Sequence, residues 1–253
     1  MASFNSRIDL PPVTKNLLII NIMLWLVEFI FPGFAERTLL PRLGLHYIGS
    51  DLFNPAQLFT YMFLHDPTGI THIFFNMFSL WMFGRILERV WGGKRYLLFY
   101  IVCGVGAALV QEGVWALTWR HDYIQGIAAL NGLTYEHMQQ IVDQAAASGD
   151  TGFIAGMTDM KNHLMTIGAS GAIFGLLLGF AFVFPDMPLY LFFIPVPIKA
   201  KYMVAGYAVL EFFFGVQGGG TIAHFAHLGG MLFGLAMMLY WKKKGTLHGN
   251  GFY

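Results

Sequence analysis

Long apolar runs separated by polar segments dominate the pattern of hydrophobic and polar positions along this chain. A helix needs roughly 20 apolar residues to cross about 30 Å of hydrocarbon. Six runs reach or approach that length, so the pattern predicts an all-α membrane protein with six transmembrane helices in a single domain over residues 1–253. The predicted spans are residues 16–32, 71–91, 96–117, 167–185, 200–216 and 222–241.

Two of the segments between these spans are long. Residues 33–70 contain proline, glycine and aromatic residues and are too interrupted to span. Residues 118–166 form a polar insertion on the outer side, and part of it has the i, i+3, i+4, i+7 spacing of an amphipathic helix. The apolar positions of that pattern are Met138, Ile141, Val142 and Ala145. With Thr134 as N-cap and Gly149 as stop, the pattern predicts a surface helix between these two residues.

The composition excludes most other classes of protein. Charged residues make up 11% of the 253 residues, against about 25% in soluble domains, and hydrophobic residues make up 56%. Together with a mean hydropathy of +0.57, these values exclude an ordinary soluble domain and a disordered chain. A net charge of +1 gives no sign of nucleic-acid binding. The single cysteine, Cys103, cannot form an internal disulfide.

The basic residues predict the orientation of the chain. An even number of spans places both termini on one side, and 11 of the 15 lysine and arginine residues fall in the segments on that side. The positive-inside rule therefore predicts cytoplasmic termini. We expect a multi-pass protein of a bacterial plasma membrane. The first run is expected to be a retained helix, because no small-residue signal cleavage site follows it.

Four polar residues are expected at one shallow depth near the outer face of the membrane. Ser170 lies about three residues into the fourth predicted span, roughly 5 Å deep, and His227 lies about five residues into the sixth, roughly 8 Å deep. His72 and Asn76 share one face of the second span, in its first turns. Polar groups inside a membrane are costly and often functional, so this convergence from three spans predicts a site.

The chemistry of these four residues suggests nucleophilic catalysis. A hydroxyl facing an imidazole is typical of a nucleophile with its general base, here Ser170 and His227. Unpaired backbone N–H groups at a helix N-terminus suit a developing oxyanion, and the His72 and Asn76 side chains would add donors. The sequence places no carboxylate with the four, so the pattern predicts a dyad rather than a triad.

Each feature alone also fits a structural role. The run Gly168–Gly171 is rich in small residues, which usually let membrane helices approach closely. Gly171, Gly175 and Gly179 form one such ridge on the fourth span, and Gly230 and Gly234 form a matching ridge on the sixth. His72 and Asn76 alone would equally serve as hydrogen bonds between helices. Only their joint occurrence at one depth favours a site.

Other polar residues in the spans predict less. His224 and His227 have the i, i+3 spacing of two metal ligands, but no third ligand is evident, so we expect no metal site. Glu28, Glu112 and Glu211 fall on scattered helices at unequal depths. That distribution favours local hydrogen bonding over a proton relay.

Several motifs in order resemble the rhomboid family of intramembrane serine proteases. The chain reads H-I-F-F-N at 72–76, G-A-S-G-A-I-F-G at 168–175 and A-H-L-G-G-M-L-F-G at 226–234. Residues 83–100 and 184–202 resemble the family's connecting stretches, so the resemblance covers roughly 55–241. It implies a six-helix, rhomboid-like bundle.

The resemblance also implies a role for each site residue. Ser170 would be the nucleophile, and His227 its general base and acid. The oxyanion would rest on the Ser170 backbone N–H, the His72 ring and the Asn76 amide. Phe174 matches an aromatic position that stacks on the catalytic histidine. The small residues implied to support the site by close helix approach are Gly168, Gly171 and Gly230.

By the same resemblance, the substrates would be transmembrane proteins of the lipid bilayer, cleaved in or near their transmembrane segments after entry between the second and fifth spans. No cofactor, metal or nucleic acid is implied, and the oligomeric state stays open. Residues 218–220 would belong to a cap over the site. One alternative is a catalytically silent rhomboid-like protein that binds transmembrane helices. Another is a small transporter, which should show an inverted repeat and a midplane site, and the sequence shows neither.

Overall fold

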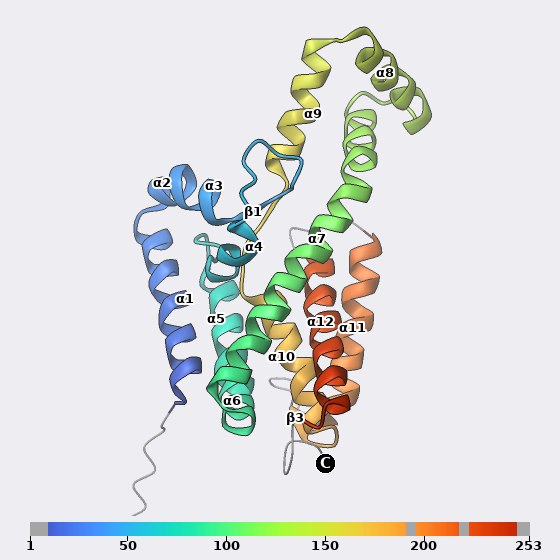
Figure 1. The fold of residues 1–253 in the computed structure, drawn as a ribbon. Helices are drawn as coiled ribbons and strands as arrows, with labels where there is room; N and C mark the ends of the chain where they lie inside the picture. Colours follow the sequence, from blue (N-terminus) through green and yellow to red (C-terminus); the bar gives the residue numbers. More distant parts are fainter. Residues whose placement is uncertain (1–9, 191–195, 218–222, 247–253) are drawn as a thin grey trace, which may run out of the picture.

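The computed structural model describes residues 10–190, 196–217 and 223–246, and most of this part of the chain is helical (Figure 1). Apolar helices coincide with the predicted spans. They are α1 (Pro12–Ile30), α5 (Ile70–Ser79) continued by η3 (Leu80–Gly84) and α6 (Arg85–Trp91), α7 (Gly93–Leu130), α10 (Ser170–Val183), α11 (Ala200–Gln217) and α12 (His224–Lys243). The predicted start of the sixth span at residue 222 and the predicted cap at 218–220 lie outside the described residues.

The all-α membrane class is confirmed. Within the described ranges, Pro12–Ile30, Ile70–Trp91 and Gly93–Leu130 are long and apolar enough to cross a membrane. The α10 helix is apolar but shorter, at 14 residues. The number of six spans therefore stays a prediction. In Figure 1 the start of α1 and the end of α12 lie at the same end of the bundle.

The helix that contains the third predicted span does not end with that span at residue 117, because α7 continues as one helix to Leu130. Residues 118–130 become polar but contain no proline, so nothing stops the helix before Asn131 and Gly132. The extended part carries α8 (Tyr135–Ser148) and α9 (Thr151–His163) beyond the other helices (Figure 1). The end of an apolar run is thus the end of a span and not of a helix.

The predicted surface helix is confirmed as α8. The Thr134 side chain accepts a hydrogen bond from the backbone N–H of His137, and Gly149 ends the helix in the left-handed region at φ 71°. The side chains that α8 buries include Met138, Val142 and Ala145, as its spacing predicts. Met138 and Val142 form a small separate core with residues of the α7 extension.

The first long connection contains short elements rather than a span. They are α2 (Pro32–Phe34), η1 (Ala35–Leu39), α3 (Leu40–Leu43), β1 (Leu45–His46), α4 (Gln57–Thr60) and η2 (Tyr61–Phe63). Strand β1 pairs antiparallel with β2 (Met165–Thr166), which leads directly into α10. This connection therefore supports the segment before Ser170. A second antiparallel pair, β3 (Pro188–Tyr190) with β4 (Pro197–Lys199), lies between α10 and α11.

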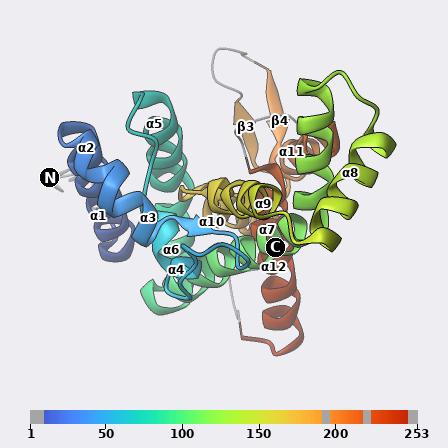
Figure 2. The same cartoon turned by 90° about the horizontal axis from the view of Figure 1, so that it is seen from above.

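Helix α10 lies in the middle of the molecule, with α5 on one side and α11 and α12 on the other (Figure 2). The predicted glycine ridges allow this close packing. A Cβ added to Gly230 would collide with the backbone of Gly171, and one added to Gly175 would collide with Cys103. The backbones of α10 and α12 therefore touch where only glycine fits, and this contact brings the starts of the two helices together.

Candidate active site

Ser170 is the first residue of α10, and a turn at Gly168 places it there. Gly168 has φ +124°, a conformation that side-chain-bearing residues rarely adopt, and a Cβ there would lie 2.9 Å from the His72 ring. Its backbone N–H donates to the carbonyl of Tyr61 over 3.0 Å. Because Ser170 opens the helix, its backbone N–H has no partner within the helix. The first turn thus presents both a hydroxyl and a free donor.

The hydroxyl of Ser170 meets the ring of His227. Nε2 of His227 lies 2.7 Å from Oγ of Ser170, and the two residues lie in the first turns of different helices. Phe174, one turn further along α10, stacks on the His227 ring with centroids 4.2 Å apart and an interplanar angle of 5°. Stacking and the hydrogen bond together hold the ring in one orientation. This geometry suits transfer of the hydroxyl proton to the imidazole.

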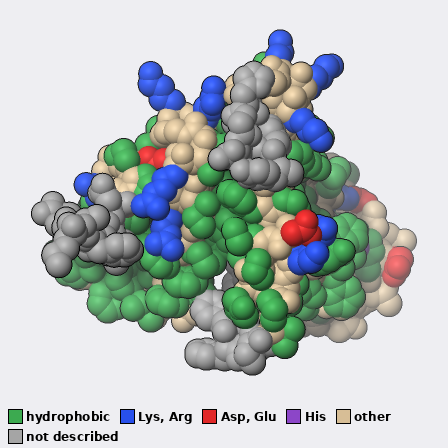
Figure 3. Space-filling view, turned by 90° about the horizontal axis from the view of Figure 1, so that it is seen from below, with side chains coloured by type: hydrophobic (Ala, Val, Ile, Leu, Met, Phe, Trp, Pro, Cys, Tyr) green, Lys and Arg blue, Asp and Glu red, His purple; other side chains and the backbone are tan. Residues whose placement is uncertain are grey.

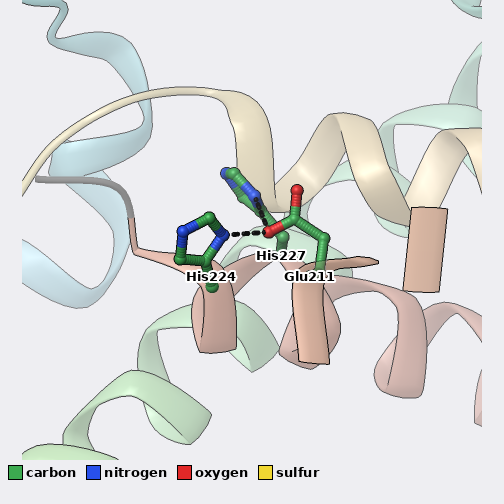
Figure 4. A group of neighbouring side chains, drawn as sticks. All are labelled: Glu211, His224 and His227. Carbon is green, nitrogen blue, oxygen red and sulfur yellow. Dashed lines mark hydrogen bonds and ion pairs between the residues drawn. The ribbon is translucent and has the colours of Figure 1, made fainter. Parts of the chain in front are cut away.

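A carboxylate also reaches this histidine, contrary to the expectation from the sequence. Oε2 of Glu211, on α11, lies 3.0 Å from Nδ1 of His227 and 2.6 Å from Nδ1 of His224 (Figure 4). The prediction that no carboxylate accompanies the site is therefore wrong. Glu211 lies two turns before the end of α11, and His224 starts α12 after a short connection, so residue counting from that connection could have found the contact.

Glu211 also adds a third possible metal ligand, which the sequence analysis did not find, to the two histidines His224 and His227. Their ligand atoms all lie within 4.8 Å of one another. Two ligands of a tetrahedral Zn²⁺, each about 2.0–2.1 Å from the ion, stand roughly 3.3 Å apart. The separations of 2.6 and 3.0 Å at Glu211 are shorter. They fit a direct hydrogen bond between Glu211 and His224 and an ion-pair contact between Glu211 and His227.

His72 and Asn76 lie across the site on α5. Nδ1 of His72 accepts a long hydrogen bond of 3.4 Å from the backbone N–H of Asp66, an arrangement that leaves the ring proton on Nε2, toward Gly168. The Asn76 amide is buried and donates one N–H to the carbonyl of His72 over 3.0 Å, so its second N–H is available. Both side chains can therefore offer a donor to the site.

His65, in the connection before α5, is a further histidine near the site that the sequence analysis did not single out. Its ring is buried and lies 5.1 Å from the His72 ring, centroid to centroid. Burial lowers the pKa of His65 to about 3, so the ring is neutral at ordinary pH. Its backbone N–H donates to the carboxylate of Glu28 on α1 over 3.1 Å. His65 thus supports His72 as a neutral, packed ring.

A cavity of about 1140 Å³ opens in front of these residues. Its lining includes Ser170, His227, His72 and Asn76, and it continues along side chains of α5 and α11. The side chains of α5, η3 and α11 in that lining include Phe75, Ser79, Met82, Met203 and Tyr207. The cavity therefore connects the Ser170–His227 pair with the space between the second and fifth predicted spans.

A family model matches most of the chain, and two known proteins are similar to shorter parts of it. The family model described as Rhomboid domain matches residues 53–244. A putative rhomboid protease, YdcA, of Bacillus subtilis (strain 168) is 31% identical over 103 residues, which are 41% of this chain and 50% of the relative. The rhomboid protease GluP of the same organism is 38% identical over 55 residues, which are 22% of this chain and 10% of GluP. The chain thus covers half of one relative and a tenth of the other.

Proposed function

The chain belongs to the rhomboid family, and from this membership we propose that it is an intramembrane serine endopeptidase. It would hydrolyse peptide bonds in or near the transmembrane segments of membrane proteins. The observation that carries the proposal is the 2.7 Å separation between the Ser170 hydroxyl and Nε2 of His227, from two different helices. The names of both relatives, which are rhomboid proteases, point to the same reaction.

In this mechanism His227 accepts a proton and gives it away once in each half of the reaction. Its Nε2 accepts the hydroxyl proton of Ser170 while Oγ attacks the carbonyl carbon of the scissile bond. The protonated ring then donates that proton to the leaving amine nitrogen, the C–N bond breaks, and an ester to Ser170 remains. A water molecule, deprotonated by the same ring, attacks the ester carbonyl. The ring then gives its proton to Oγ of Ser170 as the ester C–O bond breaks, and the second product leaves as a carboxylic acid that ionises in water. No cofactor is needed for any step.

The negative charge of the tetrahedral intermediate would be held by three donors. The backbone N–H of Ser170 is free at the start of α10. Nε2–H of His72 and the second N–H of the Asn76 amide face the same cavity. Donors that are fixed before the reaction stabilise the developing oxyanion without reorganisation.

The cavity supports the substrate class. A continuous transmembrane helix hides its carbonyl groups in backbone hydrogen bonds, so a segment must unwind before Ser170 can attack it. The space along α5 and α11 leads from the predicted membrane interior to Ser170. We propose that substrate segments enter there, between the second and fifth spans, from the lipid bilayer.

We further propose that both termini are cytoplasmic and that the protein lies in the plasma membrane, with six spans in one domain. Lys and Arg side chains are spread over the face of the bundle opposite the α8 and α9 helices (Figure 3). Lys242 and Lys243 lie in the last turn of α12, at that end. Positive charge on one face supports a cytoplasmic assignment of that face.

Purified protein in liposomes, given a transmembrane protein substrate, tests the proposal. Wild-type protein should cut the substrate, and Ser170→Ala and His227→Ala variants should not. A catalytically silent rhomboid-like binding protein would instead bind the substrate equally well in all three forms and cut it in none. Cleavage by Ser170→Ala at the wild-type rate would overturn the assignment of the nucleophile.

A further inference from the structure

A carboxylate reaches the side of His227 that faces away from Ser170. Oε2 of Glu211 lies 3.0 Å from Nδ1 of His227, whose Nε2 lies 2.7 Å from the Ser170 hydroxyl. We propose that Glu211 is a positioning residue that completes a Ser170–His227–Glu211 triad, and that His224 holds Glu211 in place. This inference rests on the proposed proteolytic function and adds the group that orients its general base.

The two contacts of the His227 ring select one tautomer. Oε2 of Glu211 lies 3.0 Å from Nδ1, close enough for its negative charge to favour the ring proton on that nitrogen. Nε2 is then the unprotonated nitrogen, and it can accept the proton of the Ser170 hydroxyl. Without Glu211, the ring proton could sit on either nitrogen, and the form with Nε2–H cannot act as base. Glu211 therefore favours the productive tautomer.

His224 fixes the carboxylate from a second direction. Its Nδ1 lies 2.6 Å from the same Oε2 of Glu211 (Figure 4). His224 stands one turn before His227 on α12, whereas Glu211 comes from α11, so the two rings hold the carboxylate against α12. The three side chains are only 10–16% exposed, and hydrogen bonds to a charged group are stronger where water is scarce.

The charge of Glu211 also acts on the charged form of the base. In the described part of the chain, the titratable side chains that face His227 are Glu211 of α11, His224 of α12 and His72 of α5. Of these three side chains only Glu211 can carry a negative charge, so its carboxylate is the source of attraction for an imidazolium at His227. It stabilises the protonated ring that forms when Ser170 attacks.

If Glu211 served only as a structural link between α11 and α12, it would make the same contacts. Such a link would affect stability but would leave unchanged the pH dependence of kcat/KM. The pH profile of kcat/KM therefore separates the two roles, because its acid limb reports the base of the free enzyme.

Glu211→Gln is the decisive variant, because it keeps the shape and removes the charge. We expect kcat to fall about 100-fold with KM unchanged, and the acid limb of kcat/KM to move roughly one pH unit lower. Glu211→Asp, which keeps the charge on a shorter side chain, should recover part of kcat and the wild-type position of the limb. His224→Gln should lower kcat by about 10-fold, since Glu211 is then less well held.

Glu112→Gln is the matched control, also a glutamate within the bundle. Glu112 lies on α7, and its Oε2 accepts a hydrogen bond of 2.7 Å from the backbone N–H of Ile48. It is not part of the proposed catalytic machinery. We expect its kcat and pH profile to match those of the wild type. A Glu211→Gln variant with kcat within about threefold of the wild type and an unchanged acid limb, while Ser170→Ala is inert, would overturn the triad and leave the proposed function standing.

A second measurement does not depend on hydrolysis. In protein carrying Ser170→Ala and ¹⁵N-labelled histidine, the NMR signals of the His227 ring should report a proton on Nδ1. The same signals should shift toward the Nε2–H form when Glu211→Ala is added. A His227 ring protonated on Nε2 while Glu211 is present would overturn the inference, whatever the activity assays show.

Discussion

Oγ of Ser170 lies 2.7 Å from Nε2 of His227, although 57 positions separate the two residues along the chain. Three features make this contact possible. The turn at Gly168 starts α10 at Ser170, the glycine contact between α10 and α12 brings the helix starts together, and Phe174 holds the imidazole ring flat against α10. The site thus depends on helix packing as much as on the reacting groups.

Asn76→Ala should slow catalysis without unfolding the protein. The Asn76 amide lines the cavity with Ser170, and loss of one oxyanion donor typically lowers kcat by about 10²–10³-fold. The measurement is kcat for cleavage of a transmembrane substrate, with thermal unfolding as a check on folding. A kcat equal to that of the wild type would remove Asn76 from the oxyanion site.

Phe174→Ala should reduce kcat modestly, and Phe174→Tyr should not. The ring of Phe174 lies flat on His227, and aromatic pairs of this kind contribute about 0.5–1.5 kcal/mol, which corresponds to roughly 2- to 10-fold in rate. Steady-state kinetics of the two variants test the role of the ring. Equal loss in both variants would indicate that packing, and not the stacked ring, matters.

Gly230→Ala should destabilise the bundle and reduce activity. Its new Cβ would collide with the backbone of Gly171, and overpacking of this kind typically costs about 1–3 kcal/mol. Gly113→Ala is the matched control in α7, because a Cβ there meets nothing within 4 Å. Thermal unfolding in detergent should show a lower midpoint for the first variant alone. Equal midpoints would contradict the glycine contact between α10 and α12.

His65 should make the protein less stable in acid. Because its pKa is lowered from 6.5 to about 3 by burial, the unfolded chain binds a proton below pH 6.5 that the folded chain does not. Above pH 6.5 the His65 ring is neutral in both the folded and the unfolded chain, so it does not change the free energy of unfolding. As the pH drops from 6.5 toward 3, that free energy falls by about 1.4 kcal/mol per pH unit. His65→Phe should remove this slope, measured as the difference in unfolding free energy between the two proteins. Parallel curves would show that His65 does not titrate in this way.

The membrane helices and the four polar residues were predictable, because both follow from the cost of polar groups in lipid. An apolar run of about 20 residues is typical of a membrane-spanning helix. Within such runs the polar residues stand out, and they include Ser170, His227, His72 and Asn76. Their depth could be counted from the ends of the spans, so their meeting was expected before any coordinates.

Three features of the structure could not be predicted from the apolar pattern of the sequence, because that pattern contains no information about them. The α7 helix continues past the predicted third span to Leu130, because hydropathy marks the end of a span, whereas breaking residues mark the end of a helix. The two-residue strands β1 and β2 are too short to show an alternating pattern. The sequence favours local hydrogen bonding for Glu211, because the apolar pattern does not show which face α11 turns toward α12. The contact with His227 depends on that rotation.

The most direct test of the account is the reaction of Ser170 itself. Wild-type protein, treated with a fluorophosphonate in liposomes, should become labelled on Ser170 and lose its ability to cut a transmembrane substrate. Ser170→Ala and His227→Ala should show neither labelling nor cleavage, whereas Ser148→Ala, at a serine on the distant helix α8, should match the wild type. Cleavage that persists in Ser170→Ala, or a label found on another residue, would contradict the central claim.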